Sequence, residues 1–339
     1  MTATHTSPTT PEAGSATRPS ARSVLVRAFG NTAAGPLAAL VIAVVVFALT
    51  TDTFFNVDNA SLIVQQFLVI GTLALGQTII ILTAGIDLAN AAIMVLGTLV
   101  IARLGQGALP GGAALVVGIL LCTAIGAAAG LIVTRLDLPP FIVTLGVLSV
   151  LTATSQLFAN GEGFSAPSGV LTFLGERSYL FGRIEVTNGM GVAVALIIGL
   201  WFLLTQTSWG RNVYAVGDDP EAARLTGINT RRTLLSVYVL AGFVYAIAAW
   251  QALGRIPNAD PNAFQTGNLD SITAVVIGGP SLFGGRGGVP GTVLGALVVT
   301  VLTNGLTQAG IDSLYQQVAT GILVIVAVAV DRVVRGRAA

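Results

Sequence analysis

Long apolar runs recur through this chain from Pro36 to Val330, separated by polar segments. An α-helix needs about 20 apolar residues to cross the hydrocarbon layer of a membrane. Only 9% of the 339 residues are charged and the mean hydropathy is +0.85, whereas soluble domains carry roughly 25% charged residues. The pattern predicts an all-α fold, a polytopic bundle of transmembrane helices.

The sequence predicts ten spans within a transmembrane domain over 36–333. They are 36–51, 60–83, 87–104, 109–134, 139–159, 189–207, 233–254, 269–283, 288–308 and 314–331. Residues 1–35 are rich in Thr, Ser, Pro and Ala at their start, which predicts a disordered cytoplasmic tail, with an interfacial helix as a further expectation. Residues 334–339 are expected to form a short cytoplasmic tail.

The placement of arginine orients the chain. With the N-terminus inside, the cytoplasmic segments hold twelve of the sixteen basic residues: Arg18, Arg22, Arg27, Arg135, Arg211, Arg224, Arg231, Arg232, Arg286, Arg332, Arg335 and Arg337. Only four basic residues lie on the external side: Arg103, Arg177, Arg183 and Arg255. Cytoplasmic loops are enriched in basic residues, so we expect both termini in the cytoplasm, as an even number of spans requires.

The residue inventory excludes several functional classes. The one histidine, His5, lies in the tail, and the one cysteine, Cys122, lies inside an apolar run. The middles of the expected spans carry no ionisable side chain, so a proton carrier and an intramembrane catalytic dyad are lacking. No metal site and no cofactor are expected. The glycine-rich stretch 278–288 has no Lys followed by Ser or Thr, so the chain has no phosphate-binding loop for ATP.

Polar side chains within the spans are candidates for a solute pathway. Uncharged groups hydrogen-bond hydroxylated solutes without the desolvation cost of a charge. The candidate path residues are Gln77, Thr83, Asp87, Asn90, Thr144, Asn304 and Gln308. The alternative for each is a hydrogen bond between helices, and for Asp87 it is capping of its own helix.

Two connections between spans are long. The external one, about 160–188, is interpreted as a lid or docking surface, or as a solvated connection. The internal one, 208–232, contains PEAARLTGI, a pattern typical of a short amphipathic helix that ends at Gly227. Pro220 suits a first helical turn and Glu221 complements the helix dipole. Such a helix needs a surface to lie on, either a partner protein or lipid.

Glycines cluster beside the short span 269–283. Gly278, Gly279, Gly284, Gly285 and Gly287 suit a close helix approach or a helix break that serves as a gate. The alternative is a tight turn.

Several strings of the sequence occur in an informative order. They are GQTIIILTAGIDLA at 76–89, LPPFIVTLG at 138–146, GDDPEAARLTGI at 217–228, LDSITAVVIGGPSLFGGRGGVPGTVLGAL at 269–297, NGL at 304–306 and YQQ at 315–317. In this order the chain resembles the permease subunits of bacterial ABC importers for ribose and related monosaccharides. The resemblance covers almost the whole chain from about residue 36.

The resemblance implies a non-catalytic subunit of the bacterial inner membrane, surrounded by lipid. It implies a second permease, identical or different, and a cytoplasmic ABC ATPase that is expected to be a tandem protein and to bind the ATP. It also implies a periplasmic or lipid-anchored solute-binding protein, and no nucleic acid. The loop 208–232 would carry the coupling helix. The residues expected to contact the ATPase are Asp218, Asp219, Pro220, Glu221, Ala222, Ala223, Arg224, Leu225 and Gly227.

The sequence departs from the family pattern where helices are expected to face the pathway. Ala89 to Ile93 replace a run rich in Ser and Gly, and Thr152–Ala153 replace an Arg–Gly pair. Asp218 and Asp219 stand where Gly and Asn are usual. The resemblance therefore implies no particular sugar. A branched-chain amino acid permease and a sodium-coupled secondary carrier are the alternative functions.

Overall fold

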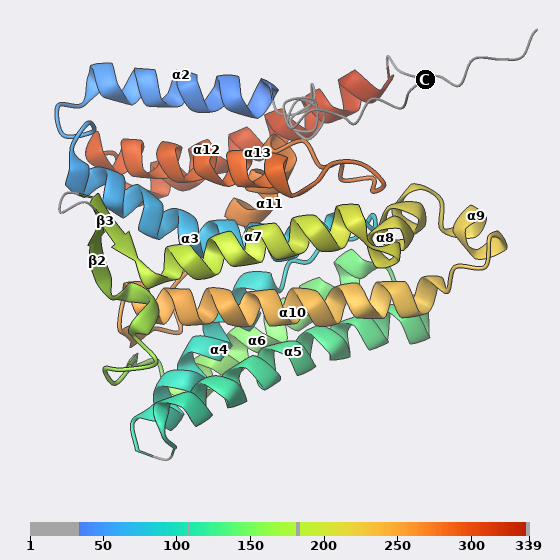
Figure 1. Cartoon of the computed structure of the whole chain (residues 1–339), viewed down its shortest axis with the longest axis horizontal. Helices are drawn as coiled ribbons and strands as arrows, with labels where there is room; N and C mark the ends of the chain where they lie inside the picture. The colour runs from blue at the N-terminus through green and yellow to red at the C-terminus, as the bar shows by residue number, and fades with distance from the viewer. Residues whose placement is uncertain (1–33, 108, 181–183, 337–339) are drawn as a thin grey trace, which may run out of the picture.

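Helices form most of the computed structural model, which describes residues 34–107, 109–180 and 184–336 (Figure 1). In chain order they are α2 (Ala34–Thr50), α3 (Val57–Ile81), α4 (Asn90–Gly105), α5 (Gly111–Leu136), α6 (Pro140–Ala159), α7 (Asn188–Gln206), α8 (Ser208–Asp218), α9 (Pro220–Leu225), α10 (Thr230–Arg255), α11 (Gly267–Ile277), α12 (Val289–Gln308) and α13 (Ser313–Gly336). The bundle confirms the expected all-α class.

Six of the described helices are long and apolar enough to cross a membrane: α3, α5, α6, α7, α10 and α12. The chain is thus a multi-pass membrane protein. A shorter apolar helix lies at each of the other four expected spans. Two of these differ from the expectation, because 84–89 precede α4 without helical structure and α11 ends at Ile277, before the expected end at 283. The count of ten crossings stays a prediction.

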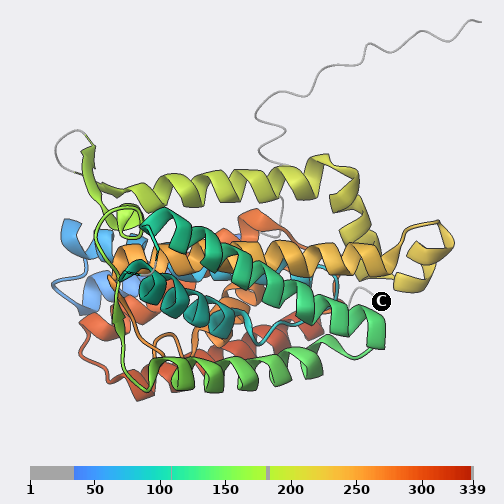
Figure 2. The same cartoon turned by 90° about the horizontal axis from the view of Figure 1, so that it is seen from below.

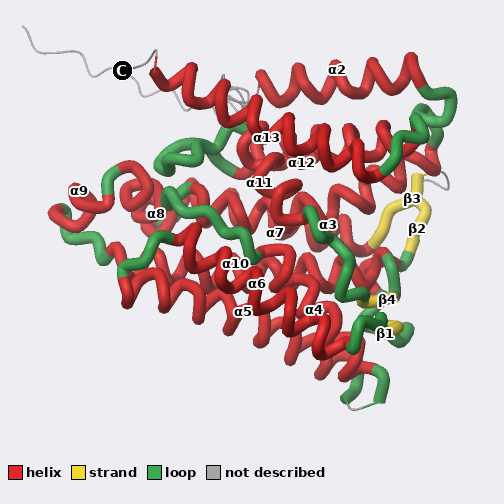
Figure 3. Tube along the Cα trace, turned by 180° about the vertical axis from the view of Figure 1, so that it is seen from behind, coloured by secondary structure: helices red, strands yellow, loops and turns green. Residues whose placement is uncertain are grey.

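Short strands gather at one end of the molecule, opposite α9 (Figure 3). Strand β1 (Phe164–Ser165) pairs antiparallel with β4 (Asn258–Ala259), and β2 (Arg177–Leu180) pairs with β3 (Ile184–Thr187). A 3-10 helix, η1 (Phe173–Gly175), lies between β1 and β2. The long connection at 160–188 therefore contains secondary structure of its own, which the sequence pattern did not indicate.

Helix α10 lies at the centre of the bundle, where it packs against α3, α4 and α5. The crossing of α5 and α10 is close because Gly126 faces Gly242. A Cβ atom added to Gly126 would lie 2.6 Å from the Tyr238 carbonyl oxygen and 3.0 Å from the Gly242 Cα. Small residues at such crossings let helices in membranes pack backbone against backbone.

Helices α6 and α7 run along opposite sides of this core (Figure 2). Only 22% of the most apolar stretch of each is buried. Most of their surface therefore faces outward, towards lipid or a partner.

The ends of the chain differ partly from the expectation. The predicted N-terminal tail and its interfacial helix fall almost wholly on residues 1–33, outside the described residues. At the other end, α13 remains helical to Gly336, past the expected start of the tail at 334. The start of α2 and the end of α13 point towards the end of the molecule that carries α8 and α9 (Figure 1).

Candidate functional site

The connection between α3 and α4 is non-helical backbone inside the bundle. Helix α3 closes at Ala84, which has a φ of 59°, and the Gly85 amide donates to the Ile80 carbonyl over 3.1 Å. The following residues leave backbone groups that helix geometry does not pair. Such groups must find partners within the protein when no water is available.

Side chains supply those partners. The Gln77 side-chain amide is oriented so that both of its groups are paired. Its nitrogen donates to the Asp87 backbone carbonyl over 3.0 Å, and its oxygen accepts from the Asp87 backbone amide over 3.2 Å. The Thr144 hydroxyl donates to the Ile86 carbonyl over 3.0 Å. Asn268 donates to the Leu88 carbonyl over 3.3 Å. Residues from α3, α6 and α11 thus hold the stretch before α4 in place.

The Asp87 side chain belongs to the same stretch. It is buried, and one carboxylate oxygen accepts from the Ala89 amide over 2.8 Å. The residue that caps α4 is Ala89, without a side-chain bond. Asp87 therefore shapes the turn that leads into its helix and does not occupy the cap position itself.

The first turns of α4 and α11 meet beside this stretch. Asn90 opens α4, and its side-chain nitrogen donates to the Ser271 hydroxyl over 2.6 Å. Gly267 opens α11, and a Cβ atom there would lie 3.2 Å from the Ala91 Cβ. The N-termini of two short helices are therefore held side by side.

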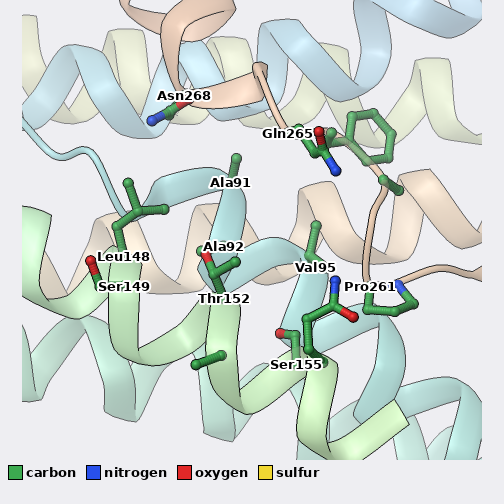
Figure 4. A pocket seen from close by; sticks show the side chains of 14 residues that line it. Ala91, Ala92, Val95, Leu148, Ser149, Thr152, Ser155, Pro261, Gln265 and Asn268 are labelled. Carbon is green, nitrogen blue, oxygen red and sulfur yellow. The ribbon is translucent and has the colours of Figure 1, made fainter. Parts of the chain in front are cut away.

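A cavity of about 530 Å³ opens next to these two N-termini (Figure 4). One wall is the start of α4, another is a face of α6, and the third is the segment that leads into α11. The lining residues are Ala91, Ala92, Val95, Leu148, Ser149, Thr152, Ala153, Ser155, Gln156, Pro261, Ala263, Phe264, Gln265 and Asn268. Ligand cavities of about 300–1,000 Å³ accommodate small molecules, so this one has room for a small solute.

The described residues that line the cavity offer neutral hydrogen-bonding groups and no charged side chain. The Ser155 hydroxyl is buried and unpaired among the described residues. Neither Thr152 nor Gln265 makes a side-chain hydrogen bond within the part of the chain that the structure describes. Helix N-termini carry a partial positive charge, so α4 and α11 add electrostatic attraction for oxygen lone pairs. No cluster of three or more metal-ligating residues occurs among the described residues.

Phe264 is the one aromatic residue in the cavity wall. Its φ is 53°, a left-handed conformation that is rare for a bulky residue. The other non-glycine residues with positive φ, Ala84, Asp137 and Asn160, each follow the end of a helix, where this conformation is common. Strained backbone of this kind concentrates at functional sites.

None of the seven path residues expected from the sequence lines this cavity. Gln77, Asp87, Asn90 and Thr144 lie directly behind its wall, in the contacts described above. Thr83 donates to the Ile80 carbonyl at the end of α3. Asn304 and Gln308 lie elsewhere, where both donate to the Asn59 side chain over 2.9 Å. Their assignment to the pathway stays a prediction.

The residues that do line the cavity carried a weaker signal. Ser149, Thr152 and Gln156 are spaced i, i+3, i+7 on α6, which places them on one helix face. That spacing was available in the sequence. Gln265 and Asn268 lie outside any long apolar run, and no pattern marked them. Two of the departures from the family pattern reach the cavity wall, since Ala91 and Ala92 of the stretch Ala89–Ile93 line it, as do Thr152 and Ala153.

The internal loop contains two helices, of which the sequence indicated only the second. Asp219 caps α9, and its carboxylate accepts from the Glu221 and Ala222 amides over 2.9 and 3.0 Å. Pro220 occupies the first turn and Gly227 has a φ of 91°. Helix α9 projects at one end of the molecule (Figure 1).

The surface of α9 is mostly exposed. Glu221 forms an ion pair of 3.3 Å with Arg224 in solvent. The Leu225 side chain is 80% exposed, while Ala223 is buried against the rest of the chain. Asp218, Asp219, Pro220 and Ala222 are also exposed. A single exposed apolar side chain is common on protein surfaces, so the seating of α9 on an ATPase stays a prediction.

Helix α8 rests on the glycine-rich loop and on the end of α3. Gly217 lies so close to α3 that an added Cβ would collide with the Leu82 carbonyl oxygen. The Gly285 amide donates to the same Leu82 oxygen over 3.0 Å, and the Tyr214 hydroxyl donates to the Gly287 carbonyl over 2.8 Å. The base of the α9 projection thus contacts the residues that lead into the α3–α4 connection.

The glycine-rich loop combines both expectations made for it. Gly279, Gly284, Gly285 and Gly287 have positive φ, as in tight turns. Gly278, at the end of α11, is instead packed against α12, since a Cβ there would lie 2.4 Å from the Gly291 carbonyl oxygen. Whether this loop serves as a gate stays a prediction.

Comparison with known proteins places these features in a family. Residues 59–328 match the family described as branched-chain amino acid transport system / permease component. The fructose import permease of Rhizobium meliloti is 42% identical over 316 residues, which cover 91% of this chain and 88% of that protein.

Two further relatives cover similar lengths. The ribose import permease of Bacillus subtilis (strain 168) is 35% identical over 301 residues, covering 88% of this chain and 92% of that protein. The galactose/methyl galactoside import permease of Escherichia coli (strain K12) is 33% identical over 307 residues, covering 86% and 91%. No solved structure matches the chain.

Proposed function

Because this chain belongs to the family of branched-chain amino acid transport system permease components, we propose that it forms the translocation pathway for a monosaccharide in an ATP-driven importer. It is a non-catalytic permease subunit. The observation that carries the sugar assignment is the cavity between α4, α6 and α11, whose lining is neutral and includes the unpaired Ser155 hydroxyl.

A sugar suits this cavity better than an amino acid does. The positive ends of α4 and α11 would attract a carboxylate, but no acidic side chain lines the cavity to hold an ammonium group. A sugar needs only neutral donors and acceptors, with an apolar surface for its C–H groups. Ser149, Thr152, Gln156 and Gln265 supply the former and Phe264 supplies the latter. The relatives named above are importers of fructose, ribose and galactose.

The proposal includes a topology of ten crossings with both termini in the cytoplasm of a bacterium. The basic residues of the α8–α9 end support it, because Arg135, Arg211, Arg224, Arg231 and Arg286 lie in the helix ends and loops expected there. The protein would then reside in the inner membrane, with β2 and β3 on the periplasmic side.

The proposed partners follow from the exposed elements. Helix α9 would sit in a cleft of a cytoplasmic ABC ATPase, a solute-binding protein would dock at the strand-bearing end, and a second permease would complete the pathway. Movement of α9 would reach the α3–α4 connection through Gly217 and the glycine-rich loop. The candidate path residues Gln77, Asp87, Asn90 and Thr144 would act there by positioning the cavity wall.

Co-purification tests this proposal. The tagged protein is extracted in detergent, its partners are identified by mass spectrometry, and ATP hydrolysis is measured. We expect an ABC ATPase in stoichiometric amount and a secreted protein that binds a monosaccharide. A stable permease without an ATPase, together with sodium-dependent uptake in vesicles, would instead favour a secondary carrier.

A further inference from the structure

A second, smaller cavity lies among α3, η1, α7 and α10, near the strand-bearing end of the molecule. Its volume is about 10 Å³, roughly that needed for one water-sized particle. The polar residues that line it are Gln65, Thr187, Gln251 and Arg255. None of them lines the cavity proposed for the sugar, and no acidic side chain is among the described residues that line this one.

Two of these side chains, Gln251 and Thr187, are buried, and each has one polar atom without a hydrogen-bond partner among the described residues. The Gln251 side-chain oxygen Oε1 accepts from the Thr72 hydroxyl over 2.7 Å, which leaves the side-chain nitrogen Nε2 unpaired within the described structure. Gln251 is only 3% exposed and Thr187 only 5%, and the Thr187 hydroxyl is also unpaired. A buried polar atom without a hydrogen bond is costly, so these two atoms indicate a missing acceptor.

Arg255 adds a full positive charge to the same wall. It is the last residue of α10, four positions after Gln251, and residues at this spacing lie on one helix face. The side chain is half-buried and forms no ion pair with a carboxylate in the described parts of the chain. By contrast, Arg231 at the other end of α10 pairs with Asp137 over 2.9 Å.

The N-terminus of α7 also faces this cavity. Thr187 is the capping residue, yet its side chain makes no capping hydrogen bond. Gly189, in the first turn, is among the lining residues. The amide groups of a helix N-terminus favour anions through their partial positive charge. The α7 helix end therefore converges as a donor with two groups from α10, the Arg255 guanidinium and the Gln251 amide.

We propose that this cavity binds a single halide ion, which is chloride under physiological conditions. A monatomic anion accepts hydrogen bonds from every direction, so one ion satisfies Arg255, Gln251 and Thr187 together. A water molecule fits the volume but leaves the guanidinium charge uncompensated. The bound ion joins α3 and the adjoining ends of α7 and α10 to η1, and so stabilises this end of the bundle. The inference goes beyond the proposed function and does not depend on which solute is carried.

Thermal unfolding of the full chain in detergent tests the site. The midpoint temperature of unfolding is measured in sodium chloride, sodium bromide and sodium gluconate at equal ionic strength. Gluconate serves as the reference anion because it is too large for the cavity. We expect the midpoint to rise by roughly 2–4 °C in either halide and to saturate with concentration. Arg255→Gln should abolish the difference, whereas Arg103→Gln, which changes an exposed arginine, should keep it.

A second variant guards against a folding defect in Arg255→Gln. Gln251→Glu places a carboxylate four positions before Arg255 and supplies the negative charge internally. We expect this protein to be as stable in gluconate as the wild type is in chloride, with no response to halide. A wild-type unfolding midpoint that is the same in all three salts would mean that water alone fills the cavity, and it would overturn the proposal. Loss of the halide response in Arg103→Gln, to the same extent as in Arg255→Gln, would also overturn it.

Discussion

The side-chain nitrogen of Asn90 lies 2.6 Å from the hydroxyl oxygen of Ser271. This bond joins the first turns of α4 and α11, two short helices that start inside the bundle and are far apart in the sequence. Discontinuous helices whose N-termini meet in this way form solute sites in many transporters. The position of the cavity therefore depends on a polar contact between two buried side chains.

Replacing Asn90 with Ala should loosen this junction. The Ser271 hydroxyl would keep its bond to the Asn268 carbonyl but lose the Asn90 donor, and one lost hydrogen bond costs about 1 kcal/mol. We expect a lower thermal midpoint and slower uptake together. Thr303→Val is the matched control, because the only hydrogen bond of the Thr303 hydroxyl among the described residues goes to the Val299 carbonyl of its own helix. Equal losses in both variants would argue against a special role for the junction.

Substitutions on the cavity wall should reduce solute uptake more than they reduce assembly of the importer. Thr152→Val keeps the shape of the side chain and removes its hydroxyl. Gln265→Leu removes an amide that forms no side-chain hydrogen bond within the described residues. Each should reduce sugar uptake several-fold, because one lost hydrogen bond to the sugar costs about 1 kcal/mol of binding free energy. The complex should still assemble and hydrolyse ATP. Uptake kinetics in vesicles measure this. Unchanged kinetics in both variants would remove the cavity from the pathway.

Phe264 allows a test of stored strain. Phe264→Ala and Phe264→Gly both remove the ring, but only glycine adopts the left-handed conformation freely. We expect the glycine variant to be more stable than the alanine variant by about 1 kcal/mol, and both to transport poorly. A glycine variant no more stable than the alanine variant in thermal unfolding would show that this backbone is not strained.

Much of the fold could be predicted from apolar runs, because a membrane requires them for every span. The pattern also placed the breaks before α4 and α11, since spans were expected to begin at Asp87 and Leu269, but it made the break before α4 too short. The length of that break depends on Gln77 and Thr144, which hold its backbone from other helices, so it could not be predicted. The same holds for the cavity. Gln77 and Asn90 are polar residues in apolar spans, like Thr152, and only the tertiary structure separates those that pair with each other from those left open to a solute.

Two neighbouring alanines on α9 should respond differently to the same substitution. Ala222 is exposed and Ala223 is buried. Ala222→Trp should leave the permease folded but prevent seating in the ATPase, so that uptake stops and ATP hydrolysis no longer responds to solute. Ala223→Trp should disturb α9 itself and lower the thermal midpoint of the isolated chain. If Ala222→Trp transported normally, α9 would not be the coupling element.

The contact between α8 and the end of α3 should be intolerant of side chains. Gly217→Ala would push a methyl group into the Leu82 carbonyl oxygen, and we expect a loss of several kcal/mol or displacement of α8. Tyr214→Phe is the milder change, because it removes only the hydrogen bond to Gly287, worth about 1 kcal/mol. ATP hydrolysis and uptake measured side by side in Tyr214→Phe should show less uptake per ATP. A normal ratio would exclude this contact from the coupling route.

Uptake into vesicles tests the central claim most directly. The permease is reconstituted with its ATPase, ATP is enclosed on the ATPase side, and the binding protein is loaded with labelled fructose, ribose or galactose. We predict accumulation of at least one sugar that requires both ATP and the binding protein, and that falls in Thr152→Val. Accumulation driven by a sodium gradient without ATP, or transport of branched-chain amino acids but of no sugar, would contradict the account.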